Sequence, residues 1–429
     1  MQGWAMKQTS LRGLANKAAK EKDYRFQNLF GMLIFGFLMW CWQFIRKNAA
    51  SGVDREDAHS YQQNLQENIK GLVEAIKGRW YRAQLMLRRY LPKPNGKLRP
   101  LGIPAIADKV LQMGVAKILE AIFEQDFLGC SYGYRPSRGA LDAIRDLSAV
   151  MRTGRYHFIV EADIRGFFDN IDHDHLLKML EKRIDDSLFL NLICKWLKAG
   201  ILETDGSIIH PVARTPQGGI VSPILANIYL HYVLDVWVEE TVTIHCRGAV
   251  YLCRYADDFV CAFQYKSDAQ RFYEVLGKRL GKYGLELAEE KTNLIRFSPL
   301  DRRENGTFEF LGFEFRWGLS RGRKPMIKWR TARKKYRASL VNMEKWCREN
   351  CHKPKAQLFK ELNAKLRGYY NYYGIIGNCD SLRDFYYWTK RVLHRVFNRR
   401  SQRRSKTWVG LRALIEAFHL QRPHTCHNI

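Results

Sequence analysis

Hydrophobic and polar positions form their most informative pattern around residue 257, where two apolar runs meet at a pair of acidic residues. Residues 253–263 have the sequence Cys-Arg-Tyr-Ala-Asp-Asp-Phe-Val-Cys-Ala-Phe. This pattern predicts a buried β-hairpin with its turn at Asp257 and Asp258. Burying adjacent carboxylates is costly unless a cation neutralises them, whereas a solvated turn needs no ligand. The hairpin alone leaves both interpretations open.

Apolar patterning predicts further elements on both sides of this hairpin. Residues 158–163 predict a β-strand that ends at Asp163, residues 175–180 predict a helix, and residues 224–230 predict a core helix after a Pro-Gly loop. Residues 30–42 are strongly apolar, but thirteen residues are short for a membrane span and no small-residue cleavage site follows. We therefore expect residues 30–42 to form a buried helix rather than a membrane anchor or signal peptide.

Asp163, at the end of the predicted strand, suggests a chemical role for the acidic hairpin. A lone Asp after a strand is usually a cap or turn residue. Together with the hairpin pair, it is a candidate third ligand for two Mg²⁺ ions about 3.5–4 Å apart, an arrangement that clamps the attacking and leaving oxygens in phosphoryl transfer. Mg²⁺ prefers carboxylates combined with substrate phosphates. We therefore expect Asp163, Asp257 and Asp258 to be catalytic residues and magnesium ligands.

Composition indicates a nucleic-acid partner. The 429 residues include 71 Lys and Arg against 43 Asp and Glu, which gives a net charge of +28. The electrostatic field of so large a positive charge favours the binding of polyanions and makes this binding salt-dependent. Residues 321–406 hold 25 basic and 5 acidic residues, interleaved with aromatic ones. Cations for phosphates and aromatic faces for bases suit single-stranded or structured RNA. The ten cysteines are expected to be free thiols, because no pair of Cys-x-x-Cys zinc knuckles is present.

Several further blocks resemble the group II intron-encoded reverse transcriptases, also called maturases. Besides the acids, the resemblance rests on residues 91–104, 131–139, 215–223, 290–292, 310–313 and 362–373, in this order. It implies an α+β right-hand polymerase, in which fingers and palm, with an antiparallel palm sheet plus helices, precede an α-helical thumb. The implied domains are 1–90 (N-terminal extension and start of the fingers), 91–318 (fingers and palm), 319–400 (helical thumb or maturase domain) and 401–429 (short DNA-binding segment).

The same resemblance implies roles for individual residues. Phe168 matches the bulky residue that excludes a 2′-hydroxyl, while Phe167 is expected to be ordinary core. Lys93 and Arg99 flank a Pro-Asn-Gly turn and would reach a triphosphate, although a solvated basic hairpin explains them as well. The nucleotide-binding set is Lys93, Arg99, Phe168, Gln217 and Lys291. The primer grip is Leu311 and Gly312, and the nucleic-acid-binding set is Arg135, Arg367, Tyr369 and Tyr372.

The implied function is RNA-directed DNA synthesis combined with intron splicing. The expected partners are a group II intron RNA, an RNA template with a DNA primer, target DNA and dNTPs, with no membrane. The expected location is the bacterial cytoplasm at the nucleoid, or an organelle. Two alternatives stay open: an RNA-binding splicing cofactor without polymerase activity, and a domesticated reverse transcriptase of a defence system. Because only about twenty-five residues follow Arg404, we expect no endonuclease domain.

Overall fold

The computed structural model describes residues 2–92, 98–209, 218–300, 306–320, 322–398 and 407–427, with side chains from Ser10 onward. The chain divides into two compact units. The first contains Met1–Gly139, Ala162–Phe259 and Gln270–Thr292, and the second contains Ala140–Glu161, Val260–Ala269 and Asn293–Ile429. Helices and antiparallel sheets are mixed throughout, so the predicted α+β class is confirmed.

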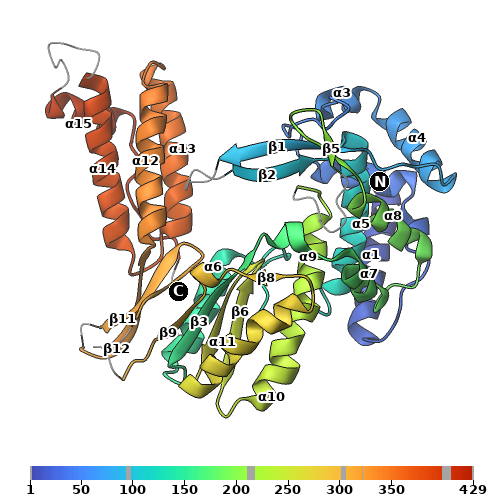
Figure 1. Ribbon diagram of the computed structural model, residues 1–429. Helices are drawn as coiled ribbons and strands as arrows, with labels where there is room; N and C mark the ends of the chain where they lie inside the picture. The colour runs from blue at the N-terminus through green and yellow to red at the C-terminus, as the bar shows by residue number, and fades with distance from the viewer. Residues whose placement is uncertain are drawn as a thin grey trace. The chain divides into compact units, whose positions relative to one another are not determined.

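Helices make up most of the first unit (Figure 1). The α-helices are α1 (Gln2–Lys20), α2 (Phe35–Cys41), α3 (Ala58–Gln63), α4 (Leu65–Lys77), α5 (Ile106–Phe123), α7 (His173–Glu181), α8 (Ser187–Leu197), α9 (Ser222–Leu230) and α10 (Thr243–His245). Short 3₁₀ helices are η1 (Phe30–Met32), η2 (Trp42–Phe44), η3 (Phe167–Asn170) and η6 (Glu289–Lys291), and π-helical turns are η4 (His231–Asp235) and η5 (Val238–Val242). The predicted helices at 175–180 and 224–230 are confirmed as α7 and α9.

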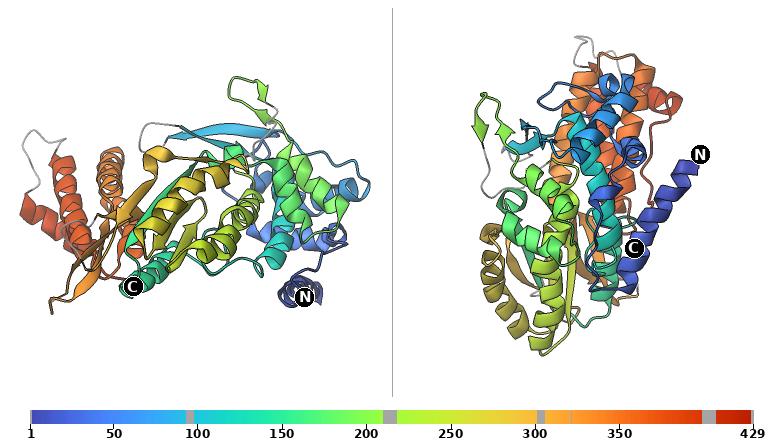
Figure 2. Two further views of the ribbon diagram at one scale, coloured as in Figure 1. Left: turned by 60° about the horizontal axis from the view of Figure 1, so that its bottom comes forward. Right: turned by 90° about the vertical axis from the view of Figure 1, so that its right-hand side faces the viewer.

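The apolar run at 30–42 is only partly buried, and it is not one helix. It forms η1, α2 and the first residue of η2, and Leu38 and Cys41 are fully buried. Gly114 of α5 provides the room for this packing, because a Cβ atom there would lie 3.1 Å from Leu38 and 3.2 Å from Leu33. Helix α1 packs along α5 as well, as Figure 2 shows. No helix among the described residues is both long and apolar enough to span a bilayer.

Two sheets involve the first unit, and strands of one of them also extend into the second. The first has the order β2-β1-β4-β5, with strands β1 (Met86–Pro92), β2 (Leu98–Ile103), β4 (Ile201–Leu202) and β5 (Ile208–Ile209). The second has the order β6-β7-β3-β8, and β9 also pairs with β3. Its strands are β3 (Phe158–Arg165), β6 (Val250–Tyr255), β7 (Asp258–Phe263), β8 (Glu286–Leu287) and β9 (Asn293–Arg296), and α11 (Lys266–Gly281) follows β7.

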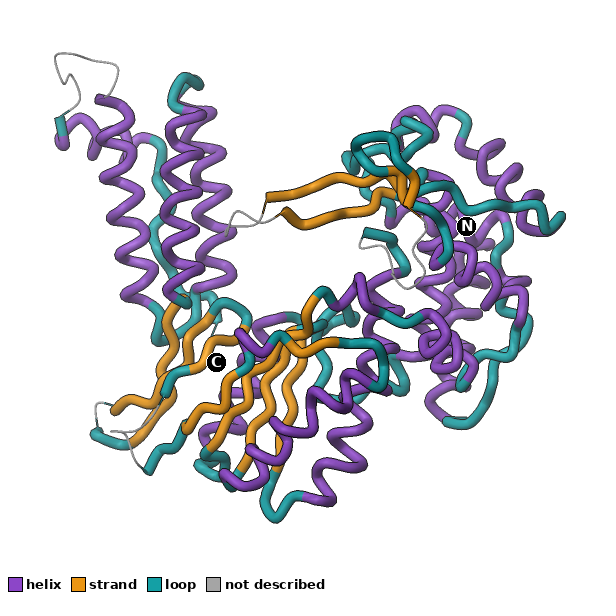
Figure 3. The backbone as a smooth tube through the Cα atoms, in the orientation of Figure 1, coloured by secondary structure: helices purple, strands orange, loops and turns teal. Residues whose placement is uncertain are grey.

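The second unit combines a small antiparallel sheet with a helical bundle (Figure 3). Its elements are α6 (Ala140–Arg152), β10 (Phe308–Phe310), β11 (Phe313–Leu319), β12 (Pro325–Thr331), α12 (Arg333–Asn350), α13 (Lys355–Tyr373), α14 (Cys379–Asn398) and α15 (Trp408–Ala417). The bundle begins at Arg333 rather than near 319, because residues 325–331 pair with β11 and bury Ile327, Trp329 and Thr331 on alternate positions.

Helices α12, α13 and α14 stand side by side around a shared apolar core, with α15 beside α14 (Figure 1). Leu366 of α13, Phe385 of α14 and Leu411 of α15 belong to this core and are almost completely buried. The chain after α15 returns along α13, where the Asn363 carboxamide accepts a hydrogen bond from the Gln421 backbone at 2.8 Å. The described part of the C-terminal segment is thus part of the bundle.

Candidate active site

The acidic hairpin predicted from the sequence is strands β6 and β7 with a tight turn between them. Ala256 and Asp257 form the turn, and Asp258 is the first residue of β7. Ala256 has a φ of +56°, a left-handed conformation that is unusual for a residue with a side chain and costs free energy. Asp257 and Asp258 are both half-buried. The turn therefore needs support from its surroundings.

One support is the loop from residue 130 to 133, which runs beside β6. Ser131 forms a parallel bridge with Arg254, and the Tyr132 backbone N–H donates to the Arg254 carbonyl at 2.9 Å. Gly133 passes so close to the turn that a Cβ atom there would clash with the backbone nitrogen of Ala256. The block at 131–139 thus includes a backbone segment that braces the acidic turn.

A second support is a buried ionic network that sequence reasoning missed. The Arg254 guanidinium donates to both carboxylate oxygens of Asp235, at 2.6 and 2.5 Å, and neither side chain is exposed. It also donates to the Ala256 carbonyl at 3.0 Å, to the Asn227 side-chain oxygen at 3.1 Å and to the Ser131 hydroxyl at 2.8 Å. Arg254 therefore ties the turn to α9, to η4 and to the bracing loop.

Asp163 lies in β3, close enough to the hairpin turn for the two carboxylates to interact. Burial raises the pKa of Asp257, and the charge of Asp163 raises it further. The Lys291 ammonium, at the end of η6, donates a hydrogen bond to the Asp163 carboxylate, and this contact raises the pKa of Lys291. The structure thus brings together Asp163, Asp257 and Lys291, three of the predicted site residues.

The donor chemistry of this cluster suits a hard divalent cation. Asp163 and Asp257 carry like charges that repel each other in a partly buried environment, and a bound cation would relieve this repulsion. At present the Lys291 ammonium neutralises Asp163. In the described ranges, no three His, Cys, Asp or Glu side chains are gathered closely enough to hold a metal ion. A metal would therefore require Asp163, Asp257 and Asp258 to turn toward a common point.

One further predicted nucleotide-binding residue, Arg99, lies near the same acids. Arg99, an exposed residue of β2, lowers the pKa of Asp257 through its charge. Phe168, in η3, is only 8% exposed and meets the Phe167 ring edge-on at 5.3 Å. Tyr134, which the sequence argument did not single out, has its pKa raised by burial and by Asp257. Its position beside the turn becomes evident only from the bracing loop.

Two predicted residues, Lys93 and Gln217, lie outside the described residues. The neighbouring Gly218 is described, and its φ of +127° favours glycine. A Cβ atom at Gly218 would clash with the Gly102 carbonyl in β2. The glycine there permits close packing of two backbone segments.

The predicted primer grip is the turn between β10 and β11. Leu311 and Gly312 both have positive φ values, 51° and 80°. The Tyr372 hydroxyl, from α13, donates to the Leu311 carbonyl at 2.7 Å. A Cβ atom at Gly312 would lie 3.1 Å from the Tyr373 hydroxyl oxygen. Tyr372 therefore supports this turn, and its contact with nucleic acid stays a prediction.

Two other residues that we predicted to contact nucleic acid have partners within the protein. The Arg135 guanidinium is buried, pairs with Glu124 at 2.8 Å and donates to the Leu128 carbonyl at 2.7 Å, so it fixes its own loop. The Tyr369 ring stacks on Phe385 at 4.0 Å within the bundle. Arg367 is exposed on α13 and stays a candidate.

Comparison with protein families matches the two regions separately. Residues 91–315, more than half of the chain, match the family described as reverse transcriptase (RNA-dependent DNA polymerase). Residues 329–414 match the group II intron, maturase-specific domain. The acidic cluster lies within the first match, and the bundle of α12 to α15 lies largely within the second.

Individual relatives agree with these matches. The group II intron-encoded protein LtrA of Lactococcus lactis subsp. cremoris is 31% identical over 405 residues, covering 75% of this chain and 66% of that protein. Protein YkfC of Escherichia coli (strain K12) is 33% identical over 283 residues, covering 58% of this chain and 74% of that protein. The chain thus spans just under two thirds of the length of LtrA. Among solved structures, telomerase from Candida albicans in complex with a fragment of telomeric RNA aligns with 84% of this chain and 66% of that one, at 12% identity and a TM-score of 0.46.

Proposed function

Because this chain belongs to the reverse transcriptase family and carries a group II intron maturase-specific domain, we propose that it is an RNA-directed DNA polymerase that also binds its intron RNA. The observation that supports this most directly is the proximity of Asp163, in β3, to Asp257, in the turn after β6, where the charge of Asp163 helps to raise the pKa of Asp257. Such a pair of opposed carboxylates is what phosphoryl transfer with divalent cations needs.

In this proposal each site residue has a distinct task. Asp163, Asp257 and Asp258 hold two Mg²⁺ ions, which when bound lower the pKa of the primer 3′-hydroxyl and neutralise charge on the triphosphate. Arg99, together with Lys93, binds the triphosphate. Lys291, which contacts Asp163, would be able to pair with a phosphate if a metal ion neutralised that carboxylate. Phe168 packs under the deoxyribose, and Gln217 contacts the nucleotide sugar or the template base.

The remaining parts of the chain bind nucleic acid. We assign residues 91–318 to fingers and palm, 319–400 to the thumb and 401–429 to contacts with target DNA, following an N-terminal extension at 1–90. The turn at Leu311 and Gly312 holds the primer end. Exposed cations on the bundle, including Arg333, Lys334, Lys335 and Arg367, bind phosphates of the intron RNA. Splicing and retrohoming of that RNA would occur in the bacterial cytoplasm at the nucleoid, or in an organelle.

The direct test is primer extension by the purified chain on an RNA template with an annealed DNA primer and dNTPs. We expect Mg²⁺-dependent DNA synthesis that EDTA abolishes and that added Mg²⁺ restores. Extension on a DNA template of the same sequence serves as the comparison. Tight RNA binding without any synthesis would contradict the polymerase and favour the alternative, a splicing cofactor that has the fold but not the reaction.

A further inference from the structure

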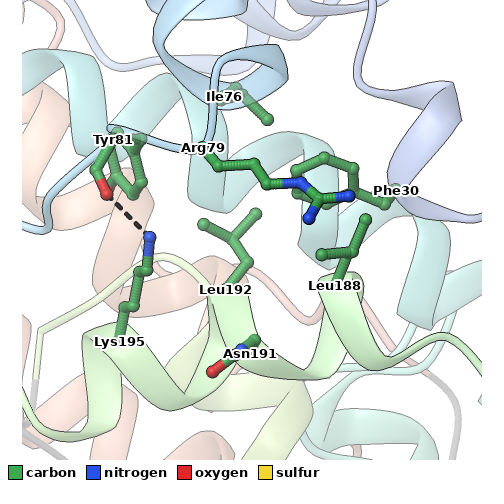
Figure 4. Close-up of a pocket in the computed structure, with 8 residues that line it drawn as sticks. All are labelled: Phe30, Ile76, Arg79, Tyr81, Leu188, Asn191, Leu192 and Lys195. Carbon is green, nitrogen blue, oxygen red and sulfur yellow. Dashed lines mark hydrogen bonds between the residues drawn. The ribbon is translucent and has the colours of Figure 1, made fainter.

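A pocket of about 240 Å³ lies in the first unit, between the end of α4 and helix α8, and none of the three acids lines it (Figure 4). Its apolar wall consists of Phe30, Ile76, Leu188 and Leu192. Its polar members are Arg79, Asn191 and Lys195, and Tyr81 closes one side. Figure 4 shows Arg79 extended across the pocket toward Phe30. The site thus combines an apolar wall with two cations.

The wall at Tyr81 is held rigidly. The Tyr81 hydroxyl donates to Asp108 at 2.5 Å and accepts from the Trp196 indole at 2.8 Å. The Lys195 ammonium donates to the Tyr81 carbonyl at 2.7 Å. The Arg79 guanidinium, in contrast, has no ion-pair or hydrogen-bond partner among the described residues. Hydrogen bonds therefore fix the Tyr81 side of the pocket, whereas the Arg79 guanidinium is available to bind a ligand.

Trp80, between two pocket residues in the sequence, is an unusually exposed aromatic residue. It is 65% exposed, although burying an indole is normally favourable. Its backbone is fixed, because Arg79 adopts a φ of +62° and the Trp80 N–H donates to the Ala75 carbonyl at 3.1 Å. The indole lies over Gly78, and a Cβ atom at Gly78 would be only 2.6 Å from the indole ring. The chain thus holds an indole out to solvent, and this indole is adjacent in sequence to two pocket residues.

An aromatic face, a small apolar pocket and cations in one place match the chemistry of unpaired nucleotides. The pocket is smaller than the about 300–1,000 Å³ typical of drug-sized ligands, so it suits a single base. Arg82, directly after Tyr81, is exposed and adds to the positive charge. A net charge of +28 favours a polyanion over a peptide of mixed charge.

We propose that Trp80 and this pocket form a subsite for a short unpaired stretch of the bound RNA. One base stacks on the Trp80 indole, the next base enters the pocket, and Arg79 and Lys195 bind the phosphates that join them. The subsite lies apart from the acids in sequence and takes no part in nucleotide addition. The inference rests on the proposed function only in that the ligand is RNA.

The test compares two RNA probes in binding assays with the full chain: a short oligouridylate and a fully paired RNA hairpin of the same length. Trp80→Ala should weaken oligouridylate binding about tenfold and leave hairpin binding unchanged, because stacking requires an unpaired base. Trp80→Phe should restore most of the affinity. Gly78→Ala, which displaces the indole without removing it, should weaken binding as well.

Charge is tested separately. Arg79→Gln should weaken both probes slightly and reduce the salt dependence of oligouridylate binding more than Lys282→Gln, a control that removes an exposed cation elsewhere in the first unit. Oligouridylate carrying 4-thiouridine should crosslink to residues 79–82 on irradiation. Unchanged oligouridylate affinity in Trp80→Ala, or crosslinks only elsewhere, would overturn the subsite.

Primer extension on a pre-annealed template separates this inference from the proposed function. Trp80→Ala should extend the primer as fast as the wild type. If the wild type extends the primer but Trp80→Ala binds oligouridylate normally, the subsite alone fails. If the wild type does not extend the primer, the polymerase proposal fails, and the binding comparison still decides the subsite.

Discussion

The Arg254 guanidinium grips the Asp235 carboxylate with two hydrogen bonds of 2.6 and 2.5 Å, and both side chains are fully buried. Because the same guanidinium donates to the Ala256 carbonyl, a pair of residues that touches no substrate holds the turn that presents Asp257. A buried ion pair costs desolvation energy, so it is weak evidence for stability. We interpret this pair as fixing the geometry of the turn.

Arg254→Lys tests this positioning role. Lysine keeps the charge but lacks the planar fork, so it cannot bond Asp235 and Ala256 together. We expect kcat for primer extension to fall by up to about 10²-fold through misplacement of the turn, with KM for dNTP changed much less. Steady-state kinetics measure both. A kcat equal to that of the wild type would mean that the turn holds itself in place.

Removing the Arg254 side chain tests its energetic role. Arg254→Ala leaves Asp235 buried without a partner and should lower the free energy of unfolding by about 3–5 kcal/mol. The control is Arg145→Ala, whose pair with Asp142 at 2.8 Å is half-exposed and should contribute less than about 1 kcal/mol. Denaturant unfolding measures both variants, and equal losses would contradict the burial argument.

Tyr372→Phe tests the support of the predicted primer grip. It removes the 2.7 Å bond to the Leu311 carbonyl, worth about 1 kcal/mol, from a turn with two positive φ values. We expect a higher KM for the primer–template and a nearly unchanged kcat. The matched control is Tyr387→Phe, since Tyr387 is 61% exposed. Identical kinetics for both variants would show that Tyr372 does not support primer binding.

Phe168 and Phe167 test sugar selection against core packing. Phe168→Ala should raise incorporation of ribonucleotides relative to deoxyribonucleotides, because the ring would otherwise exclude a 2′-hydroxyl. Phe167→Ala should instead cost about 3–5 kcal/mol of stability through a cavity. The readout is the ratio of kcat/KM for dNTP and rNTP. An unchanged ratio in Phe168→Ala would make this residue ordinary core, as its 8% exposure alone would suggest.

His231 predicts how acid affects stability. Burial lowers the pKa of His231 to about 4, whereas the unfolded chain binds this proton near pH 6.5. Stability from this residue is therefore complete above about pH 6.5 and is lost as the pH falls toward 4, because only the unfolded state takes up the proton. Between about pH 7 and pH 5, the wild type should lose about 2 kcal/mol more than His231→Gln in denaturant unfolding. Equal losses would contradict a buried neutral imidazole.

The sequence predicted the acidic hairpin well because its signal is local. An acid pair between apolar runs is visible within eleven residues, and the structure has the expected hairpin there. Arg254 stands inside the same run, and a cation within an apolar strand was a signal of a buried partner. Its partner Asp235 lies in a π-helical turn that no local pattern indicates.

The neighbours of Arg135, Tyr369 and Tyr372 within the fold were not visible in the sequence. The resemblance to the family assigned these residues to nucleic acid, and those contacts stay predictions. The structure adds that Arg135 pairs with Glu124 and that Tyr369 stacks on Phe385. Which face of a helix or loop is buried depends on its tertiary neighbours, and these are not given by the residue's own motif.

The central claim is that Asp257 carries the polymerase reaction as a metal ligand, and Asp257→Asn tests it most directly. Asparagine has nearly the shape of aspartate but no charge. Because burial and the charge of Asp163 both disfavour the ionised form of Asp257, the fold should persist and intron splicing should continue. The measurement is the rate of Mg²⁺-dependent primer extension on an RNA template. We predict a fall of several orders of magnitude with RNA binding retained. Extension at the wild-type rate would contradict the account.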